Sequence, residues 1–165
     1  MASNEQSRPL AVVDIDGVLA DVGHRLHFLD RRPKDWRGFF AAARSDPPHD
    51  EGLQLVAELV AAGHEIILLT GRPEHCRADT EAWLAEHLVA HELLVMRPAD
   101  NRRPAAEVKV GVLRLLATDR TVAILVDDDP RVIEAARGAG FPVRLAHWGR
   151  PSEPLRQAQE VEGRT

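Results

Sequence analysis

Short apolar runs and amphipathic stretches alternate along most of this chain. Residues 10–13 form the run Leu-Ala-Val-Val, which is typical of a parallel strand buried on both faces. Similar runs at 65–69, 93–96, 122–126 and 142–146 predict four further strands.

Helical periodicity predicts one helix between each two successive strands. These helices are expected at 51–63, 74–90, 104–116 and 131–138. In the third helix the expected apolar side carries Val108, Val112, Leu115 and Leu116. Because strands alternate with helices, the chain is expected to form an α/β fold, a parallel sheet with helices on both faces.

Residues 21–50 break this alternation with several prolines and a glycine. The segment is long and has its own apolar residues and a short helical stretch at 36–44, so it predicts a small cap insertion over the strand ends rather than a simple crossover. The polar ends at about 1–8 and 150–165 are expected to be flexible tails. The whole of 1–165 is expected to form a single domain.

Composition narrows the class of protein. The chain is 44% hydrophobic, enough for a core, and no apolar run reaches transmembrane length. It has one cysteine, Cys76, and no signal segment, so we expect a soluble cytoplasmic protein. A net charge of −5 argues against an extended basic surface that binds nucleic acid, but it is compatible with a local basic patch.

Two carboxylates follow the first predicted strand directly, in Asp14-Ile15-Asp16-Gly17. Burying a carboxylate without a partner is costly, so this pair needs a cation, hydrogen-bond donors or a raised pKa. Alternate residues of a strand point to one side, which places Asp14 and Asp16 together. The pattern favours a Mg²⁺ site; the alternative is that the acids cap the following turn.

Other polar residues fall at the same edge of the predicted sheet. Ligands of such sheets bind outside the carboxyl ends of the strands. The residues expected there are Asp14, Asp16, Thr70, Lys109, Asp127 and Asp128. This set suits phosphoryl transfer through a covalent aspartyl-phosphate, with Asp14 as nucleophile and Asp16 as general acid and base.

The remaining members of the set would neutralise and hold the phosphate. Mg²⁺ bound by Asp14 and the Asp127/Asp128 pair, together with Lys109, would balance the negative charge. The Thr70 hydroxyl and the backbone N–H groups that follow it, beginning with Gly71, would hold the phosphate oxygens. The alternatives are a helix cap for Thr70 and an exposed helix position for Lys109.

The chain resembles a known family in four segments. Asp-Ile-Asp-Gly-Val-Leu-Ala-Asp, Leu-Leu-Thr-Gly-Arg-Pro, Val-Lys and Leu-Val-Asp-Asp are similar, in this order, to the motifs of the haloacid dehalogenase (HAD) superfamily, over about residues 10–148. The resemblance implies a Rossmann-like three-layer sandwich with strand order 3-2-1-4-5 and a Mg²⁺-dependent phosphatase activity. It also implies metal ligation by Asp14, by the backbone carbonyl of Asp16, and by Asp127 or Asp128.

A narrower resemblance is to the 3′-phosphatase domain of polynucleotide kinase-phosphatases. It rests on Arg25, on Arg72 and on the segment 103–109, Arg-Pro-Ala-Ala-Glu-Val-Lys, in which Ala105 replaces a frequent acid. The resemblance implies that Arg25 and Arg72 help bind the substrate phosphate. The expected substrate is a phosphate ester such as a 3′-phosphorylated DNA or RNA end. We find no kinase motif, so 5′-kinase activity is expected in another chain or not at all.

Two alternatives stay open at the level of function. One is a nucleotidase or another small-molecule phosphatase of the same superfamily. The other is a phosphoacceptor receiver domain, but receivers are phosphorylated at the end of their third strand and place their lysine after the fifth. In this chain the third predicted strand ends in Arg97, and Lys109 precedes the fourth.

Overall fold

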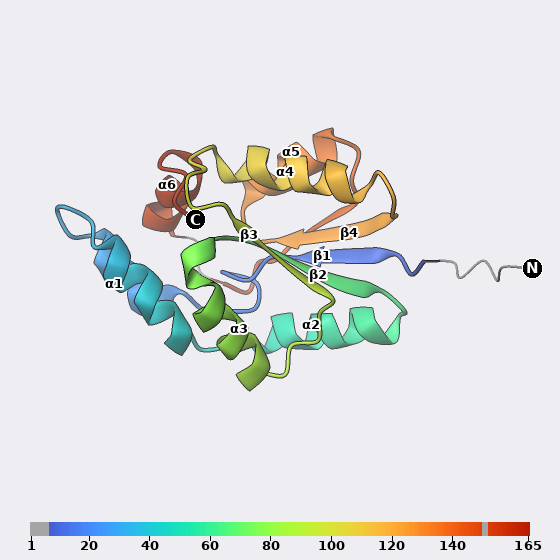
Figure 1. Cartoon of the computed structure of the whole chain (residues 1–165), viewed down its shortest axis with the longest axis horizontal. Helices are drawn as coiled ribbons and strands as arrows, with labels where there is room; N and C mark the ends of the chain where they lie inside the picture. Colours follow the sequence, from blue (N-terminus) through green and yellow to red (C-terminus); the bar gives the residue numbers. More distant parts are fainter. Residues whose placement is uncertain (1–6, 150–151) are drawn as a thin grey trace, which may run out of the picture.

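A computed structural model describes residues 7–149 and 152–165 (Figure 1). Its centre is a five-stranded parallel sheet in the order β3-β2-β1-β4-β5, which confirms the Rossmann-like architecture. The strands are β1 (Leu10–Val13), β2 (Glu65–Pro73), β3 (Leu93–Arg97), β4 (Val122–Asp127) and β5 (Val143–Leu145).

Helices cover both faces of this sheet (Figure 1). On one face lie α2 (Asp50–Ala61) and α3 (Arg77–Glu86), the latter after a short 3-10 turn η3 (Glu74–Cys76). On the other lie α4 (Ala105–Leu116) and α5 (Pro130–Gly138). Alternate residues of β1 enter the two cores, since Ala11 and Val13 belong to the first and Leu10 and Val12 to the second.

The buried side of helix α4 differs in part from the predicted apolar side. Its buried residues are Ala105, Lys109, Val110 and Leu113, whereas Leu115 is 70% exposed. Val112 and Leu116 pack against the core as predicted, whereas the prediction that Leu115 lies on the apolar side is wrong. Lys109 and Leu113 are one helical turn apart on the buried side, and Leu115, two positions after Leu113, faces away from it.

The segment predicted as a cap contains η1 (Gly23–Leu29), α1 (Trp36–Ala41) and η2 (Ala42–Ser45). It lies beyond the carboxyl ends of the strands (Figure 1). Leu29, Phe39 and Phe40 are buried and join the core that β1 shares with α2 and α3. The cap is thus packed onto the sheet by its own apolar residues.

The end of the chain differs from the expected flexible tail at 150–165. Helix α6 (Glu153–Glu160) begins after Ser152, whose hydroxyl accepts a hydrogen bond from the Leu155 N–H at 3.3 Å. Leu155 and Ala158 are buried in the core. Residues 1–6 of the other predicted tail, and 150–151, lie outside the described residues. No helix within the described part of the chain is long and apolar enough to cross a membrane.

Candidate active site

Three carboxylates converge where β1 and β4 end. Asp14 follows β1, Asp127 closes the neighbouring β4, and Asp128 comes next. Each offers one oxygen, and these oxygens all lie within 4.8 Å of one another. The two strands are adjacent in a parallel sheet, so their carboxyl ends meet at one edge, and the predicted metal-binding side chains come together there.

Lys109 supplies one positive charge to this group. Its Nζ lies 2.9 Å from Asp14 Oδ2 and 2.6 Å from Asp127 Oδ2. Burial lowers the pKa of Lys109, but Asp127 and Asp14 outweigh burial and raise that pKa above its ordinary value. Helix α4 therefore holds a charged ammonium inside the site, and the carboxylates still outnumber it.

The excess of carboxylates over cations raises the pKa values of two of the acids. Burial, which Lys109 opposes, and the charge of Asp127 raise the pKa of Asp14 to about 7. Burial and the charges of Asp127 and Asp14 raise the pKa of Asp128 well above its usual value. Asp128 Oδ1 is also buried without a hydrogen-bond partner among the described residues. A hard dication would satisfy this oxygen and favour all three charged forms, so the donor set fits a metal ion.

Gly17 gives the loop after β1 its path past this cluster. Its φ is +82°, a conformation that side chains disfavour, and a Cβ at this position would collide with the carboxylate of Asp128. A glycine is required here by both the turn and the close approach of the two segments.

Three of the predicted phosphate-binding residues border a small cavity. Thr70, Gly71 and Lys109 line this space of about 140 Å³ together with residues of β3 and α4. The Thr70 hydroxyl accepts a hydrogen bond from the backbone N–H of Arg72 at 3.1 Å. Both residues lie within β2, so this hydroxyl does not form the alternative helix cap. A Cβ on Gly71 would collide with the backbone of Thr165, so the end of the described chain packs against this loop.

Asp16 belongs to a second group of charges. Its Oδ1 lies 2.6 Å from Arg72 Nη2 and 3.0 Å from Arg25 Nη2, and all three side chains are buried. Burial raises the pKa of Asp16, but Arg72 and Arg25 outweigh it and lower that pKa to about 2. Arg25 and Arg72 thus lie beside the predicted acid, and their predicted contact with the substrate phosphate stays a prediction.

Sequence reasoning missed Asp46, the fourth member of this group. Its carboxylate lies 2.9 Å from Arg25 Nε and 2.9 Å from Arg72 Nη2. Burial raises the pKa of Asp46, an effect that Arg25 opposes. In the sequence Asp46 precedes Pro47 and Pro48, where an acid is typical of a turn, so no local signal distinguishes it.

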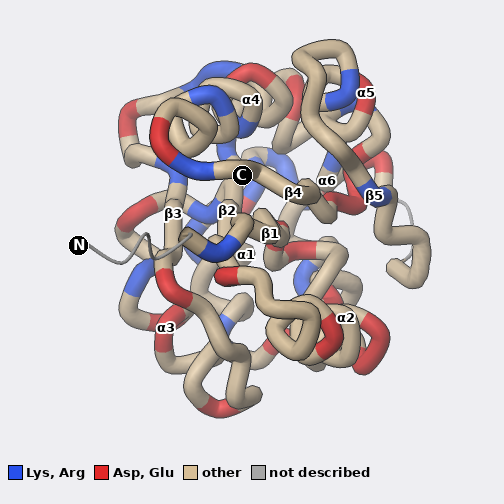
Figure 2. Tube along the Cα trace, turned by 90° about the vertical axis from the view of Figure 1, so that its right-hand side faces the viewer, with Lys and Arg blue, Asp and Glu red and all other residues tan. Residues whose placement is uncertain are grey.

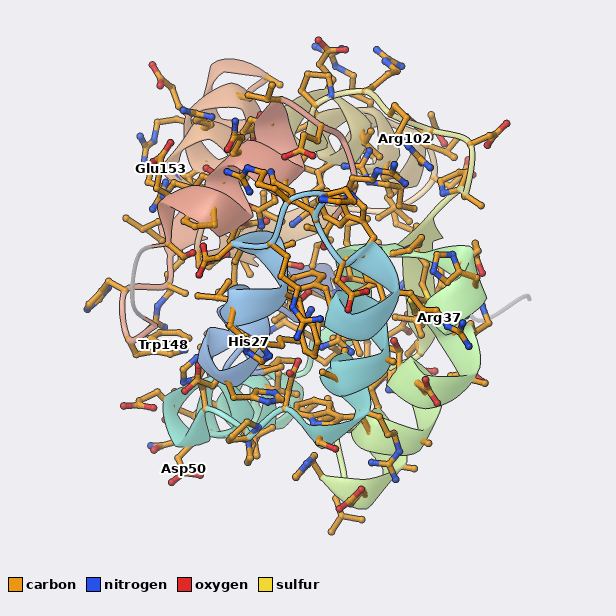
Figure 3. All side chains as sticks on the ribbon, turned by 90° about the vertical axis from the view of Figure 1, so that its left-hand side faces the viewer. His27, Arg37, Asp50, Arg102, Trp148 and Glu153 are labelled. Atoms are coloured by element: carbon orange, nitrogen blue, oxygen red, sulfur yellow. The ribbon has the colours of Figure 1, made fainter. Side chains whose placement is uncertain are left out.

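A large cavity opens beside the cluster of Asp14, Asp127 and Asp128. It measures about 690 Å³ and is bordered by Gly17 and Asp128, by cap residues and by the start of α6. Among the described residues that border it are four acids, Asp21, Asp30, Asp128 and Glu153, and two histidines, His24 and His49. Figure 3 views the molecule from this end, with Glu153 and Asp50 on one side and Arg37 and Arg102 on the other.

This fold, with its acid cluster and inward lysine, defines a HAD-type hydrolase. More narrowly, a family model described as the polynucleotide kinase PNKP phosphatase domain matches residues 9–148, and the chain belongs to this family. No curated protein matches the chain.

Solved structures share the fold. A chain in "Structure of Pnkp1/Rnl/Hen1 complex" is 23% identical with a TM-score of 0.70, and the match covers 89% of this chain and 49% of that one. A chain of the Pnkp1/Rnl/Hen1 RNA repair complex is 24% identical with a TM-score of 0.67, covering 91% and 46%. This chain thus spans about half the length of those relatives. A HAD family enzyme of Bacteroides thetaiotaomicron, in complex with magnesium and inorganic phosphate, is 11% identical with a TM-score of 0.54, covering 90% and 98%.

Proposed function

We propose that this protein is a Mg²⁺-dependent phosphomonoesterase that works through an aspartyl-phosphate on Asp14. The observation that carries the proposal is the cluster of Asp14, Asp127 and Asp128 oxygens within 4.8 Å, with Lys109 between two of them. Phosphate and carboxylates share a pocket only when cations neutralise them.

The reaction has two steps that use the same two acids. An oxygen of Asp14 attacks phosphorus, the bond from phosphorus to the leaving oxygen breaks, and Asp16 gives that oxygen a proton. Water then attacks phosphorus and gives a proton to Asp16, and the bond from phosphorus to the Asp14 oxygen breaks, so that inorganic phosphate leaves and the Asp14 carboxylate is restored. The arginines favour the charged form of Asp16, and a bound phosphate beside it counters them, because a like charge raises the pKa of a carboxyl.

Other residues position the phosphate. The Thr70 hydroxyl, the Gly71 N–H and the Lys109 ammonium are the groups we assign to its oxygens. Asp14, Asp127, Asp128 and the backbone carbonyl of Asp16 would hold Mg²⁺. When bound, the ion would neutralise charge that develops on the phosphoryl group.

For the substrate we propose the 3′-phosphate of a polynucleotide end. Family membership supports this choice, and so does the side of the site face that carries Arg37 and Arg102 (Figure 3). Basic side chains at that side can contact the backbone phosphates of a strand whose end enters the site.

A small-molecule phosphate ester is the second candidate. The described residues that line the cavity beside Asp128 include Asp21, Asp30 and Glu153, and the negative charges of these three side chains disfavour a polyanion. A neutral or cationic leaving group of modest size fits such a cavity better than a nucleic acid strand.

One pair of assays tests both levels of the proposal. Purified protein should hydrolyse a generic phosphate ester with added Mg²⁺ and not with a chelator, and Asp14→Asn should be inactive. A 3′-phosphorylated oligonucleotide is then compared with free mononucleotides at equal concentration. Preference for the oligonucleotide supports the first substrate, and preference for mononucleotides supports the second. Wild-type activity that survives in Asp14→Asn refutes the mechanism.

A further inference from the structure

Asp46 has no role in the reaction proposed above, yet it contacts both arginines that hold Asp16. Its Oδ1 lies 2.9 Å from Arg25 Nε and 2.7 Å from His24 Nε2. Its Oδ2 accepts from Arg25 Nη2 at 3.0 Å and from Arg72 Nη2 at 2.9 Å. Both oxygens of this buried carboxylate are therefore used to hold the side chains next to Asp16.

The arginines contact only one of the two oxygens of Asp16. Oδ1 accepts from Arg25 Nη2 at 3.0 Å, from Arg72 Nη2 at 2.6 Å and from Arg72 Nε at 3.0 Å. Oδ2 is buried and has no partner among the described residues. A buried carboxylate oxygen without a donor is costly and calls for an explanation. The network turns the carboxyl so that Oδ2 alone is left for a further proton or ligand.

Asp46 and Arg25 are themselves held firmly. The Arg25 guanidinium lies over the Phe39 ring, 4.3 Å from its centre. The indole N–H of Trp83 donates to the backbone carbonyl of Asp46 at 2.7 Å. Asp46 is at the end of the cap and Trp83 is on α3, so the position of Asp46 is fixed from both the cap and the core.

We propose that Asp46 is a positioning residue, which fixes Arg25 and Arg72 so that Oδ2 of Asp16 faces the leaving oxygen of the substrate. This inference rests on the proposed phosphatase function. As the bond from phosphorus to that oxygen breaks and the bond to Asp14 forms, the proton on Asp16 Oδ2 passes to the leaving oxygen. Without the Asp46 charge, both arginines are drawn to Asp16 alone and its carboxyl loses this orientation.

Two substrates separate positioning from a merely structural role. β-Glycerophosphate releases an alkoxide that needs a proton, whereas p-nitrophenyl phosphate releases a phenolate that leaves without one. In Asp46→Asn, kcat/KM for β-glycerophosphate should fall at least about tenfold, and kcat/KM for p-nitrophenyl phosphate less than about threefold. This constant covers the steps up to leaving-group departure, so later hydrolysis of the aspartyl-phosphate does not enter. The ratio of the two constants is also independent of the folded fraction.

A second variant and a control complete the test. Arg25→Lys keeps the positive charge but lacks the fork that spans Asp46 and Asp16, so it should show the same selective loss. Asp35→Asn is the matched control, because Asp35 is an acid of the same cap whose side chain accepts the Gly38 N–H at 2.8 Å. It should leave both rate constants unchanged.

The outcomes separate this inference from the function on which it rests. Equal losses on both substrates in Asp46→Asn and Arg25→Lys would overturn the positioning role and leave the phosphatase function intact. Failure of the wild-type protein to hydrolyse either ester would refute the phosphatase function and, with it, this inference.

Discussion

Two groups of buried charges lie side by side after β1, and they differ in charge balance. The lysine cluster (Asp14, Lys109, Asp127 and Asp128) has three carboxylates and one ammonium. The arginine network (Asp16, Arg25, Asp46 and Arg72) has two carboxylates and two guanidinium groups. The first group keeps a net negative charge, whereas the second is neutral as a whole.

The difference in charge balance distinguishes a group that binds a ligand from a group that holds other side chains in place. Buried charge without a counter-charge is costly, so a protein retains it where a ligand completes it. The lysine cluster therefore favours a cation, while the charges of the arginine network balance without a ligand and fix the orientation of Asp16. Away from the site, acidic and basic residues are interspersed (Figure 2), so this contrast belongs to the buried charges and not to the surface.

Removal of the nucleophile should have the largest effect. Asp14→Asn should lower the phosphatase rate by at least about 10⁴-fold, because the amide cannot form the aspartyl-phosphate. Circular dichroism should show an unchanged fold. Residual activity within tenfold of wild type would mean that another group attacks phosphorus.

Removal of one cation from the arginine network should destabilise the fold. Arg72→Met leaves Asp16 and Asp46 with a single arginine, and breaking a buried ion pair in this way costs about 3–5 kcal/mol. Urea unfolding measures the loss. Arg31→Met is the control, because Arg31 pairs with Asp35 on the exposed side of the cap, and it should cost less than about 1 kcal/mol.

Mg²⁺ should stabilise the folded protein through the lysine cluster and not through the arginine network. Mg²⁺ at a hundred times its dissociation constant should raise the free energy of unfolding of the wild type by about 2.7 kcal/mol. Asp128→Asn should lose most of this gain, and Asp46→Asn should keep it. If Mg²⁺ stabilises both variants equally, the ion binds elsewhere.

Asp14 and Asp16 should make the stability of the metal-free protein depend on pH with opposite signs. Asp14 has a pKa of about 7 in the folded protein against 3.8 as its ordinary value, so the folded state binds the extra proton between these limits. The contribution of Asp14 to the free energy of unfolding is fully present below pH 3.8 and is lost as the pH rises through 7. Between these limits the free energy of unfolding falls by up to about 1.4 kcal/mol per pH unit.

Asp16 behaves in the reverse manner. Its pKa is lowered from 3.8 to about 2, so its contribution is present above 3.8 and is lost as the pH falls toward 2. Chemical unfolding across this range checks both signs. Mg²⁺ should flatten the slope above pH 4, since bound metal favours the charged form of Asp14; a slope unaffected by Mg²⁺ would point to other groups.

The lysine cluster and the fold were accessible from the sequence for one reason. Strand ends of a parallel sheet meet at one edge, so Asp14 and Asp127 could be placed together once their strands were recognised. Sheet order followed from the resemblance and was confirmed. Lys109 could be placed in the site from its motif, whereas the exposure of Leu115 in α4 was not predicted by the apolar pattern.

The arginine network was less accessible. Its partner Asp46 comes from the cap, whose path is set by prolines and tertiary packing rather than by a repeating pattern. Residues after 152 were expected to be flexible because the segment is polar, yet Leu155 and Ala158 are enough to dock α6 beside the site. The mean hydropathy of a polar segment does not reveal two apolar residues that lie on the buried side of a helix.

The most direct test compares Asp128→Asn with Asp46→Asn in metal-free protein near pH 8, by the free energy of unfolding. The charge balance predicts opposite results. Asp128→Asn should be as stable as the wild type or more stable, because it relieves repulsion among the acids. Asp46→Asn should lose about 3–5 kcal/mol, because it leaves an arginine without its counter-charge. Losses of similar size in both variants would contradict the distinction between the two groups.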